Sequence, residues 1–245
     1  MNPRDDGLVP PPLLQVHTAN SADHLARQLA QHMARRLRKA ITTRGHAVLA
    51  VSGGKSPVAL FEQLRQQPLE WDHVTVLLVD ERCVPHTHPD SNSALVRTHL
   101  LQGAAAKASF VPFFDQVPDV LDDAALDALA DGANARLAAQ PWPMDVAVLG
   151  MGEDGHTASL FPGAPQLPKA LHHSGPVTWL RPPAAPHVRL TLTLPALLTT
   201  HELMLSITGA TKLAVYQQAC RAADENLPIS LVLNQHVTPV SVWLA

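Results

Sequence analysis

Cysteines, aromatic residues and long apolar runs are all scarce in this chain of 245 residues. Two cysteines are too few for a disulfide framework, which favours a reducing, cytoplasmic setting. The aromatic share of 4% leaves few platforms on which the bases of single-stranded nucleic acid could stack. No apolar run reaches the ~18–20 residues that a membrane-spanning helix requires. We therefore expect a cytoplasmic protein with no membrane partner.

Charge of one sign is also sparse, because the formal net charge is −3 and the basic residues are dispersed. The densest basic stretch is the short run from Arg35 to Lys39. A surface of this kind attracts neither DNA nor an anionic membrane in general, so no nucleic-acid partner is expected. Any anion that binds this protein has to be held by a local cluster of donors.

The first twelve residues differ from the rest of the chain. Pro10, Pro11 and Pro12 cannot donate to a sheet ladder, and the segment lacks the apolar core of a secretory signal. We expect residues 1–12 to form a flexible N-terminal tail. Hydrophobic residues make up 46% of the chain, which is enough for a full core. No long linker interrupts residues 13–245, so we expect them to form a single α/β domain.

Beyond the tail, short apolar runs alternate with helical patterns. Apolar residues recur every fourth position between Leu25 and Leu37, with Ser21 as a cap and Gly45 as a stop. On the same grounds, helices are expected at 21–43, 91–101, 122–139 and 210–222. Strands are expected at 47–51, 74–79, 110–114, 145–149, 177–180, 189–194, 203–208 and 240–244. The strand at 189–194 alternates Leu and Thr, so we expect it to be half-exposed.

Strands that alternate with helices predict an α/β fold, with a doubly wound, mostly parallel sheet and helices on both faces. Ligands of such sheets bind outside the carboxyl ends of the strands. Three expected loops at these ends are rich in glycine or charge: Ser52 to Lys55, Asp80 to Arg82, and Gly150 to His156. The sequence therefore predicts a binding site where these loops meet.

Two of these loops resemble nucleotide-binding motifs and then depart from them. Gly150 to Gly155 has the G-x-G-x-x-G spacing, but no acidic residue follows at the distance that a ribose contact requires. The loop at Lys55 ends like a Walker A motif, but Leu49 stands where its first glycine belongs. The Gly53-Gly54 turn precedes a helix that starts near Pro57, and its open backbone N–H groups suit a single phosphate better.

Five segments, in order along the chain, carry a recognisable pattern. They are Val51-Ser52-Gly53-Gly54, Asp80-Glu81-Arg82-Cys83-Val84-Pro85, Asp90-Ser91-Asn92, Gly150 to Pro162, and Ile207 to Lys212. Together they resemble the 6-phosphogluconolactonase family. The resemblance implies a modified doubly wound fold shared with glucosamine-6-phosphate isomerases. It also implies hydrolysis of 6-phospho-D-glucono-1,5-lactone, the second step of the oxidative pentose phosphate pathway, with no cofactor.

The residues themselves suit that chemistry. Hydrolysis of a lactone needs a water molecule made nucleophilic, and an imidazole with an unperturbed pKa of ~6.5 can take the proton of this water near neutral pH. His156 follows a glycine loop at a strand end, so we expect it to be the general base. Asp154 is close enough in sequence to orient its ring or to bind a sugar hydroxyl.

A phosphate dianion is expected to meet fixed cations at the other end of the substrate. The resemblance assigns Arg82 and Lys212 to substrate binding, with the Gly53-Gly54 turn supplying backbone donors. Further candidates for the substrate or phosphate are Lys55, Asp80, Gly155 and Arg189. Lys55 stands where the family usually has a hydroxyl residue. Asp80 either binds sugar hydroxyls or holds Arg82 in place.

Two other functions stay open at this point. One is a glucosamine-6-phosphate isomerase or deaminase, whose family requires a glutamate shortly after the histidine loop; here the next acidic residue is Glu202. The other is a non-catalytic sugar-phosphate sensor. Cys83, His86, His88 and Asp90 crowd one loop, but their spacing fits no regular zinc pattern, so no metal is expected. The chain is expected to be a monomer or a small homo-oligomer.

Overall fold

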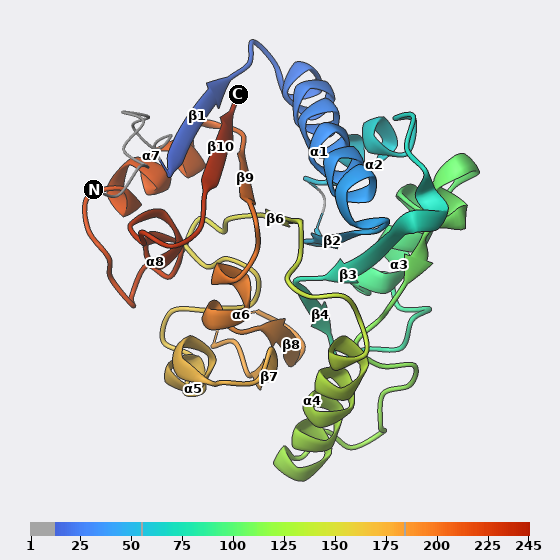
Figure 1. Cartoon of the computed structure of the whole chain (residues 1–245). Coiled ribbons are helices and arrows are strands. Elements are labelled where there is room, and N and C mark those ends of the chain that lie inside the picture. Colours follow the sequence, from blue (N-terminus) through green and yellow to red (C-terminus); the bar gives the residue numbers. More distant parts are fainter. Residues whose placement is uncertain (1–12, 55, 184) are drawn as a thin grey trace, which may run out of the picture.

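A parallel sheet forms the centre of the protein (Figure 1). The computed structural model describes residues 13–54, 56–183 and 185–245. Within this part, the strand order is β1-β10-β9-β6-β2-β3-β5, and all neighbouring strands are parallel. The bounds are β1 Leu14–Thr18, β2 Ala47–Val51, β3 Val74–Leu78, β5 Ser109–Phe110, β6 Val146–Leu149, β9 Leu203–Ile207 and β10 Val240–Leu244. The predicted mostly parallel sheet is confirmed.

The apolar runs of the sequence form the middle of this sheet. Every residue of β2 and β6 is buried. A parallel strand covered on both faces has no polar side to show, which is why its sequence reads as continuous Val, Leu and Ala. The edge strand β1 is different, because none of its residues is buried and it is held by its pairing with β10.

Helices connect the strands and pack around them (Figure 1). Their bounds are α1 Ala22–Arg44, α2 Val58–Leu64, α3 Asn92–His99, α4 Asp123–Ala138, α5 Leu167–His172, α6 Leu194–Leu198, α7 Ala210–Ala219 and α8 Ile229–Leu233, with 3-10 turns η1 Trp71–His73 and η2 Gly103–Lys107. The predicted limits of α1 hold. The Ser21 hydroxyl accepts the N–H of His24 at 3.2 Å, and Gly45 ends the helix at φ +79°.

A second, antiparallel sheet joins β4 Asp80–Arg82, β8 Arg189–Leu192 and β7 Val177–Leu180 in the order β4-β8-β7. The expected loop at Asp80 to Arg82 is therefore a short strand. The expected half-exposure of 189–194 is wrong, because all of β8 is buried. The Thr191 hydroxyl is satisfied inside the protein, where it accepts the N–H of Ser159 at 3.1 Å. Of the strand expected at 110–114, only Phe110 lies in a strand, because β5 ends there.

The order of the central sheet reverses between β2 and β6. From β2 the chain moves outward through β3 to β5, whereas from β6 it moves the other way through β9 to β10. At such a switch point the connections leave in opposite directions and open a crevice beyond the carboxyl ends of the two strands. Ser52 and Gly150 are the first residues beyond those ends.

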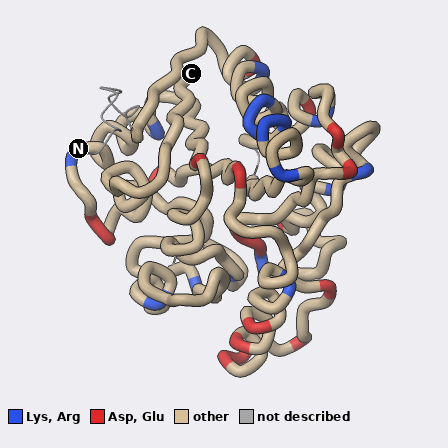
Figure 2. Tube along the Cα trace, in the orientation of Figure 1, with Lys and Arg blue, Asp and Glu red and all other residues tan. Residues whose placement is uncertain are grey.

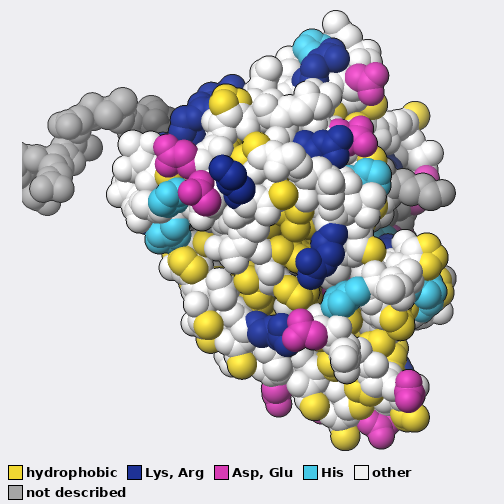
Figure 3. Space-filling view, turned by 90° about the vertical axis from the view of Figure 1, so that its right-hand side faces the viewer, with side chains coloured by type: hydrophobic (Ala, Val, Ile, Leu, Met, Phe, Trp, Pro, Cys, Tyr) yellow, Lys and Arg dark blue, Asp and Glu magenta, His cyan; other side chains and the backbone are white. Residues whose placement is uncertain are grey.

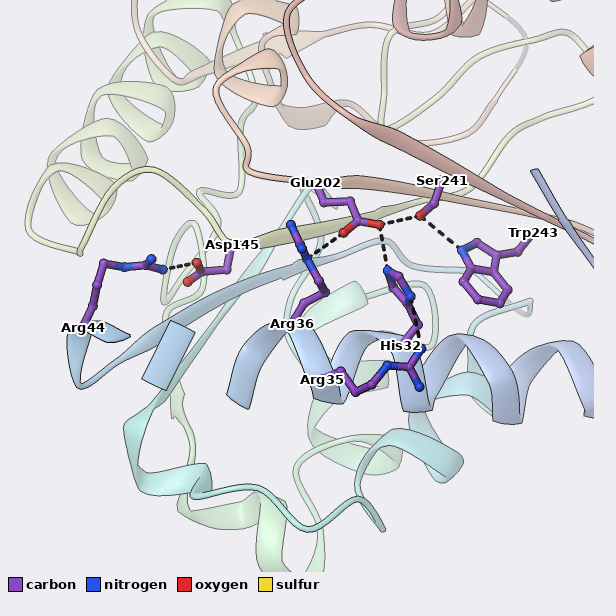
Figure 4. A network of polar contacts seen from close by, with 8 residues as sticks. All are labelled: His32, Arg35, Arg36, Arg44, Asp145, Glu202, Ser241 and Trp243. Atoms are coloured by element: carbon purple, nitrogen blue, oxygen red, sulfur yellow. Dashed lines mark hydrogen bonds and ion pairs between the residues drawn. The ribbon is translucent and has the colours of Figure 1, made fainter. Parts of the chain in front are cut away.

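Polar contacts fix α1 onto the sheet near the amino ends of β6 and β9, away from the crevice (Figure 4). Glu202, just before β9, pairs with Arg36 at 2.7 Å and with His32 at 2.8 Å, and it accepts the Ser241 hydroxyl at 2.8 Å. An ion pair between Arg44 and Asp145 adds a contact beside β6. Because both carboxylates are nearly buried, these partners are needed to offset their desolvation.

Two helices at the surface each carry charge of mostly one sign. Basic residues lie along α1 and acidic residues along α4 (Figure 2). On the face in Figure 3, Lys and Arg side chains alternate with Asp and Glu. None of the helices in the described part of the chain is both long and apolar enough to cross a membrane.

Candidate active site

A cavity of about 260 Å³ lies at the switch point of the sheet. Its walls come from the segments that follow β2, β3 and β6 and from the first turn of α7. The lining residues include Ser52, Gly53, Gly54, Asp80, Arg82, Asn92, Gly152, His156, Ser206 and Lys212. The three loops selected from the sequence therefore do meet at one place.

The turn after β2 forms one wall through a close backbone approach. Gly53 lies so close to Asn92 that a Cβ atom would overlap the amide group. Gly54 has φ +92°, which glycine adopts without strain. The turn leads through Pro57 into α2. Lys55, the predicted phosphate contact in this turn, lies outside the described residues.

His156, which also lines the cavity, is held in place by three contacts. Its Nδ1 lies 2.5 Å from Oδ1 of Asp154, and the same oxygen accepts the backbone N–H of His156 at 3.1 Å. The ring stacks on Phe161 with 4.2 Å between centroids. A Cβ atom at Gly152 would overlap the imidazole, so glycine is required beneath the ring. The contact with Asp154 leaves Nε2 as the ring nitrogen available to a ligand.

Two cations line the cavity, one from β4 and one from α7. Arg82 ends β4, and its Nη1 donates to the backbone oxygen of Asp90 at 2.6 Å. Lys212 is the third residue of α7 and lines the same cavity. Arg189 does not line it but pairs with Arg82 in the β4–β8 register. Burial, together with the guanidinium of Arg82, lowers the pKa of Arg189 from its ordinary value.

Asp80 is a nearly buried carboxylate on the cavity wall. Its Oδ2 accepts the Ser159 hydroxyl at 2.7 Å, and its Oδ1 accepts the Asn92 amide at 3.3 Å. Among the described residues, Arg82 makes its side-chain hydrogen bond elsewhere, with Asp90. Both carboxylate oxygens of Asp80 thus have partners within the protein, and its two predicted roles both stay predictions.

Glu81 anchors the cation-bearing strand from behind. Its carboxylate is buried and accepts the backbone N–H groups of Arg82, Asn92 and Ser93, each at 2.7 Å. It also accepts the hydroxyl of Ser91 at 3.2 Å. These bonds tie β4 to the first turn of α3, so they fix the positions of Arg82 and Asn92 in the cavity wall.

Glu81→Gln is expected to lower the free energy of unfolding by about 2–3 kcal/mol. The amide nitrogen would face backbone N–H groups that now point at a carboxylate, and a buried donor would lose its acceptor. Urea denaturation measures the effect. The exposed Glu70→Gln serves as the matched control and should change stability by less than about 0.5 kcal/mol. Equal stability of both variants would refute the anchoring role.

Not every predicted residue reaches the cavity, and some lining residues were not predicted. Gly155 has φ +76° and faces Leu227, so its contribution is to the shape of the histidine loop. Asn92 and Ser206 line the cavity without having been singled out as site residues. Asn92 stood inside a recognised motif, which was a usable signal. Ser206 lies within β9, and nothing in the strand pattern marked it.

The crowded loop after β4 is divided by the fold. Burial raises the pKa of the Cys83 thiol to about 12, with the Glu81 carboxylate adding to the effect. This thiol is therefore protonated at neutral pH. His86 is engaged with the backbone oxygen of Phe114 at 2.9 Å. Only His88 and Asp90 of the four residues lie together.

The fold places the chain among the doubly wound α/β proteins that bind ligands at a sheet switch point. The chain belongs to the glucosamine-6-phosphate isomerase/6-phosphogluconolactonase family, whose model matches residues 20–243. This finding confirms the resemblance seen in the sequence.

Individual relatives agree with this assignment. A 6-phosphogluconolactonase of Pseudomonas aeruginosa is 45% identical over 221 residues, which cover 89% of this chain and 90% of the relative. One from Neisseria meningitidis is 42% identical, with 94% and 98% covered. The crystal structure of a 6-phosphogluconolactonase from Shewanella baltica superposes with a TM-score of 0.89 at 38% identity, covering 95% of this chain and 98% of that one. A monomeric glucosamine-6-phosphate deaminase shares the fold, with a TM-score of 0.73 at 17% identity and coverage of 94% and 96%.

Proposed function

We propose that this protein hydrolyses 6-phospho-D-glucono-1,5-lactone to 6-phosphogluconate, the second step of the oxidative pentose phosphate pathway. One observation carries the proposal: His156 and the two cations, Arg82 and Lys212, line the same cavity. Such a cavity suits a substrate that has a phosphate at one end, to bind the two cations, and an ester carbonyl at the other, to meet the imidazole. The names and high identity of the relatives support the same reaction.

In the proposed mechanism, Asp154 accepts Nδ1–H of His156 and so leaves Nε2 with a free lone pair. Nε2 takes a proton from water while the oxygen attacks C1 of the lactone. The tetrahedral intermediate then expels the ring oxygen, which receives the proton from the imidazolium. Atoms balance without a cofactor, since water is added across the C1–O bond.

The phosphate is proposed to lie against Arg82 and Lys212, with backbone donors from the Gly53-Gly54 turn. Arg189 lies beside Arg82 on the neighbouring strand, and its buried Nη1 has no hydrogen-bond partner among the described residues. Two adjacent guanidinium groups repel each other, and a dianion in front of them offsets this repulsion. Asp80 is proposed to accept a hydrogen bond from a sugar hydroxyl.

A glucosamine-6-phosphate isomerase or deaminase is the second candidate because the fold is shared. That chemistry needs an additional acid near the histidine. The first acidic residue after His156 is Glu202, and it is engaged with His32, Arg36 and Ser241 at the amino end of β9 (Figure 4). It is therefore not available to the cavity, and the lactonase is favoured.

The test of the function offers both substrates to the purified chain. Freshly made 6-phosphogluconolactone is followed by acid release in a pH-stat, with the spontaneous rate subtracted. Glucosamine 6-phosphate is followed by ammonia release. We expect acid release well above the blank and no ammonia. Ammonia release would favour the isomerase or deaminase, and tight binding of 6-phosphogluconate without turnover would favour the sensor.

Asp154→Asn is expected to lower kcat at least about tenfold with a small change in KM, because the amide no longer fixes the Nδ1–H tautomer. The neighbouring exposed Glu153→Gln removes the same charge from the same loop and serves as the control. Steady-state kinetics of both variants separate the two effects. Equal losses in both would mean that only the loop's charge matters.

A further inference from the structure

Three side chains converge beside the cavity in a cluster that the proposed reaction does not use. His88 and Asp90 lie in the loop between β4 and α3, and His187 lies just before β8. The Nε2 atom of His187 is 3.0 Å from Oδ2 of Asp90, and Nδ1 of His88 is 3.8 Å from the same oxygen. In the described part of the chain, this is the one group of three potential ligands whose donor atoms lie within 4.8 Å of one another.

The spacing suits a tetrahedral metal ion. Ligand atoms at about 2.0–2.1 Å from Zn²⁺ in tetrahedral geometry are ~3.3 Å apart. The two separations from the Asp90 oxygen lie on either side of this value, and no two of the three donor atoms are more than 4.8 Å apart, so side-chain rotations bring them to one ion. Two imidazoles and one carboxylate are ligands that Zn²⁺ prefers, and three protein ligands leave a fourth position for water.

The backbone holds the two loops together without the ion. Cys83 donates its N–H to Val188 at 2.8 Å, which continues the β4–β8 pairing toward His187. His187 has φ +69°, a left-handed conformation that is uncommon outside glycine. The imidazole rings of His88 and His187 meet edge to face, with 5.1 Å between centroids. A site arranged in advance costs less ordering when a ligand binds.

The side chains are also chemically accessible. The exposed fractions are 36% for His88, 50% for Asp90 and 27% for His187, so an ion can reach all three from solvent. His88 Nδ1 accepts the backbone N–H of Asp90 at 3.1 Å, so its lone pair points toward the backbone of the proposed partner Asp90. Coordination would replace this bond and the one between His187 and Asp90.

We propose that His88, Asp90 and His187 form a binding site for Zn²⁺ or another divalent transition metal of the same ligand preference. The site lies one hydrogen bond from the cavity, because the backbone oxygen of Asp90 holds Arg82. The spacing within the loop alone gave no regular zinc pattern, since the third ligand comes from a residue 97 positions further along the chain.

Isothermal titration of the metal-free full chain with Zn²⁺ tests the proposal. We expect one strong site per chain. His187→Asn and His88→Asn should each weaken it more than about 100-fold, since loss of even an outer partner of a metal ligand costs ~10–100-fold. Asparagine tolerates the left-handed backbone of residue 187, so the first variant removes the ligand without forcing a new loop conformation.

His172→Asn is the matched control, because His172 is an exposed histidine with one acidic neighbour, Glu225, at 4.0 Å. It should leave Zn²⁺ binding unchanged. Circular dichroism checks the fold of each variant, and Asp90→Asn replaces any variant that fails to fold. The proposal is overturned if the native chain has no strong site, if folded ligand variants bind Zn²⁺ as well as the native chain, or if His172→Asn weakens binding equally.

Discussion

His156→Ala is expected to lower kcat for 6-phosphogluconolactone by about 10²–10⁴-fold, which is the usual contribution of a general base. The affinity for 6-phosphogluconate should stay within a few-fold of the native value, because the proposed phosphate contacts are made by other residues, Arg82 and Lys212. The side chain is about a third exposed, so its truncation leaves no large buried cavity. Steady-state kinetics with a no-enzyme blank and equilibrium binding of the product measure the two quantities separately.

His236→Ala is a suitable control for this experiment, because His236 is exposed and is not among the residues that line the cavity. Its kinetics should match those of the native chain. If His156→Ala instead lost product binding and retained the turnover of bound substrate, the histidine would be a binding residue. The proposed path of the proton would then be wrong.

Lys212→Ala is expected to raise KM by roughly 10–100-fold, since one hydrogen bond to a charged group contributes about 1.5–3 kcal/mol. The phosphate takes no part in bond breaking, so the contact is equally strong in the ground state and the transition state, and kcat should change little. Alanine is a strong helix former, and the first turn of α7 should persist.

Lys107→Ala, at an exposed residue of η2, provides the control for removal of a positive charge. Its KM should be unchanged at ordinary ionic strength. Equal falls of kcat and kcat/KM in Lys212→Ala would contradict the account, because they would place the lysine at the reacting centre rather than at the phosphate.

The sequence predicted the parts of the fold that depend on local patterns. The buried strands β2, β3 and β6 are continuous apolar runs, and α1 has both periodicity and caps. β1 was missed because it is an edge strand without buried residues, and it forms only by pairing with β10 at the other end of the chain. β4 was missed because three polar residues form a strand only when β8 pairs with them.

The candidate site was predictable to a similar degree and for similar reasons. Asp80 and Arg82 lie in the segment after β3, His156 in the segment after β6 and Lys212 in the segment after β9, and a parallel sheet brings such segments to one edge. Sequence reasoning could not separate Arg82 from Arg189, because the two are direct partners in the β4–β8 register and only the three-dimensional structure shows that Arg82 alone of the two lines the cavity.

The clustering of His88 with His187 depends on the same long-range pairing. The β4–β8 ladder brings the segment before β8 next to the loop that follows β4, and no local pattern in either segment marks the other. The spacing of residues within one loop therefore cannot reveal a metal site in this fold when one of the ligands comes from another segment.

A crystal structure with 6-phosphogluconate bound tests whether His156 faces the reacting carbon while Arg82 and Lys212 hold the phosphate. We expect the C1 carboxylate within about 2.6–3.2 Å of Nε2 of His156, with the phosphate bonded to Lys212 and Arg82. A product bound the other way round, or bound away from the imidazole altogether, would contradict the mechanism proposed for this chain.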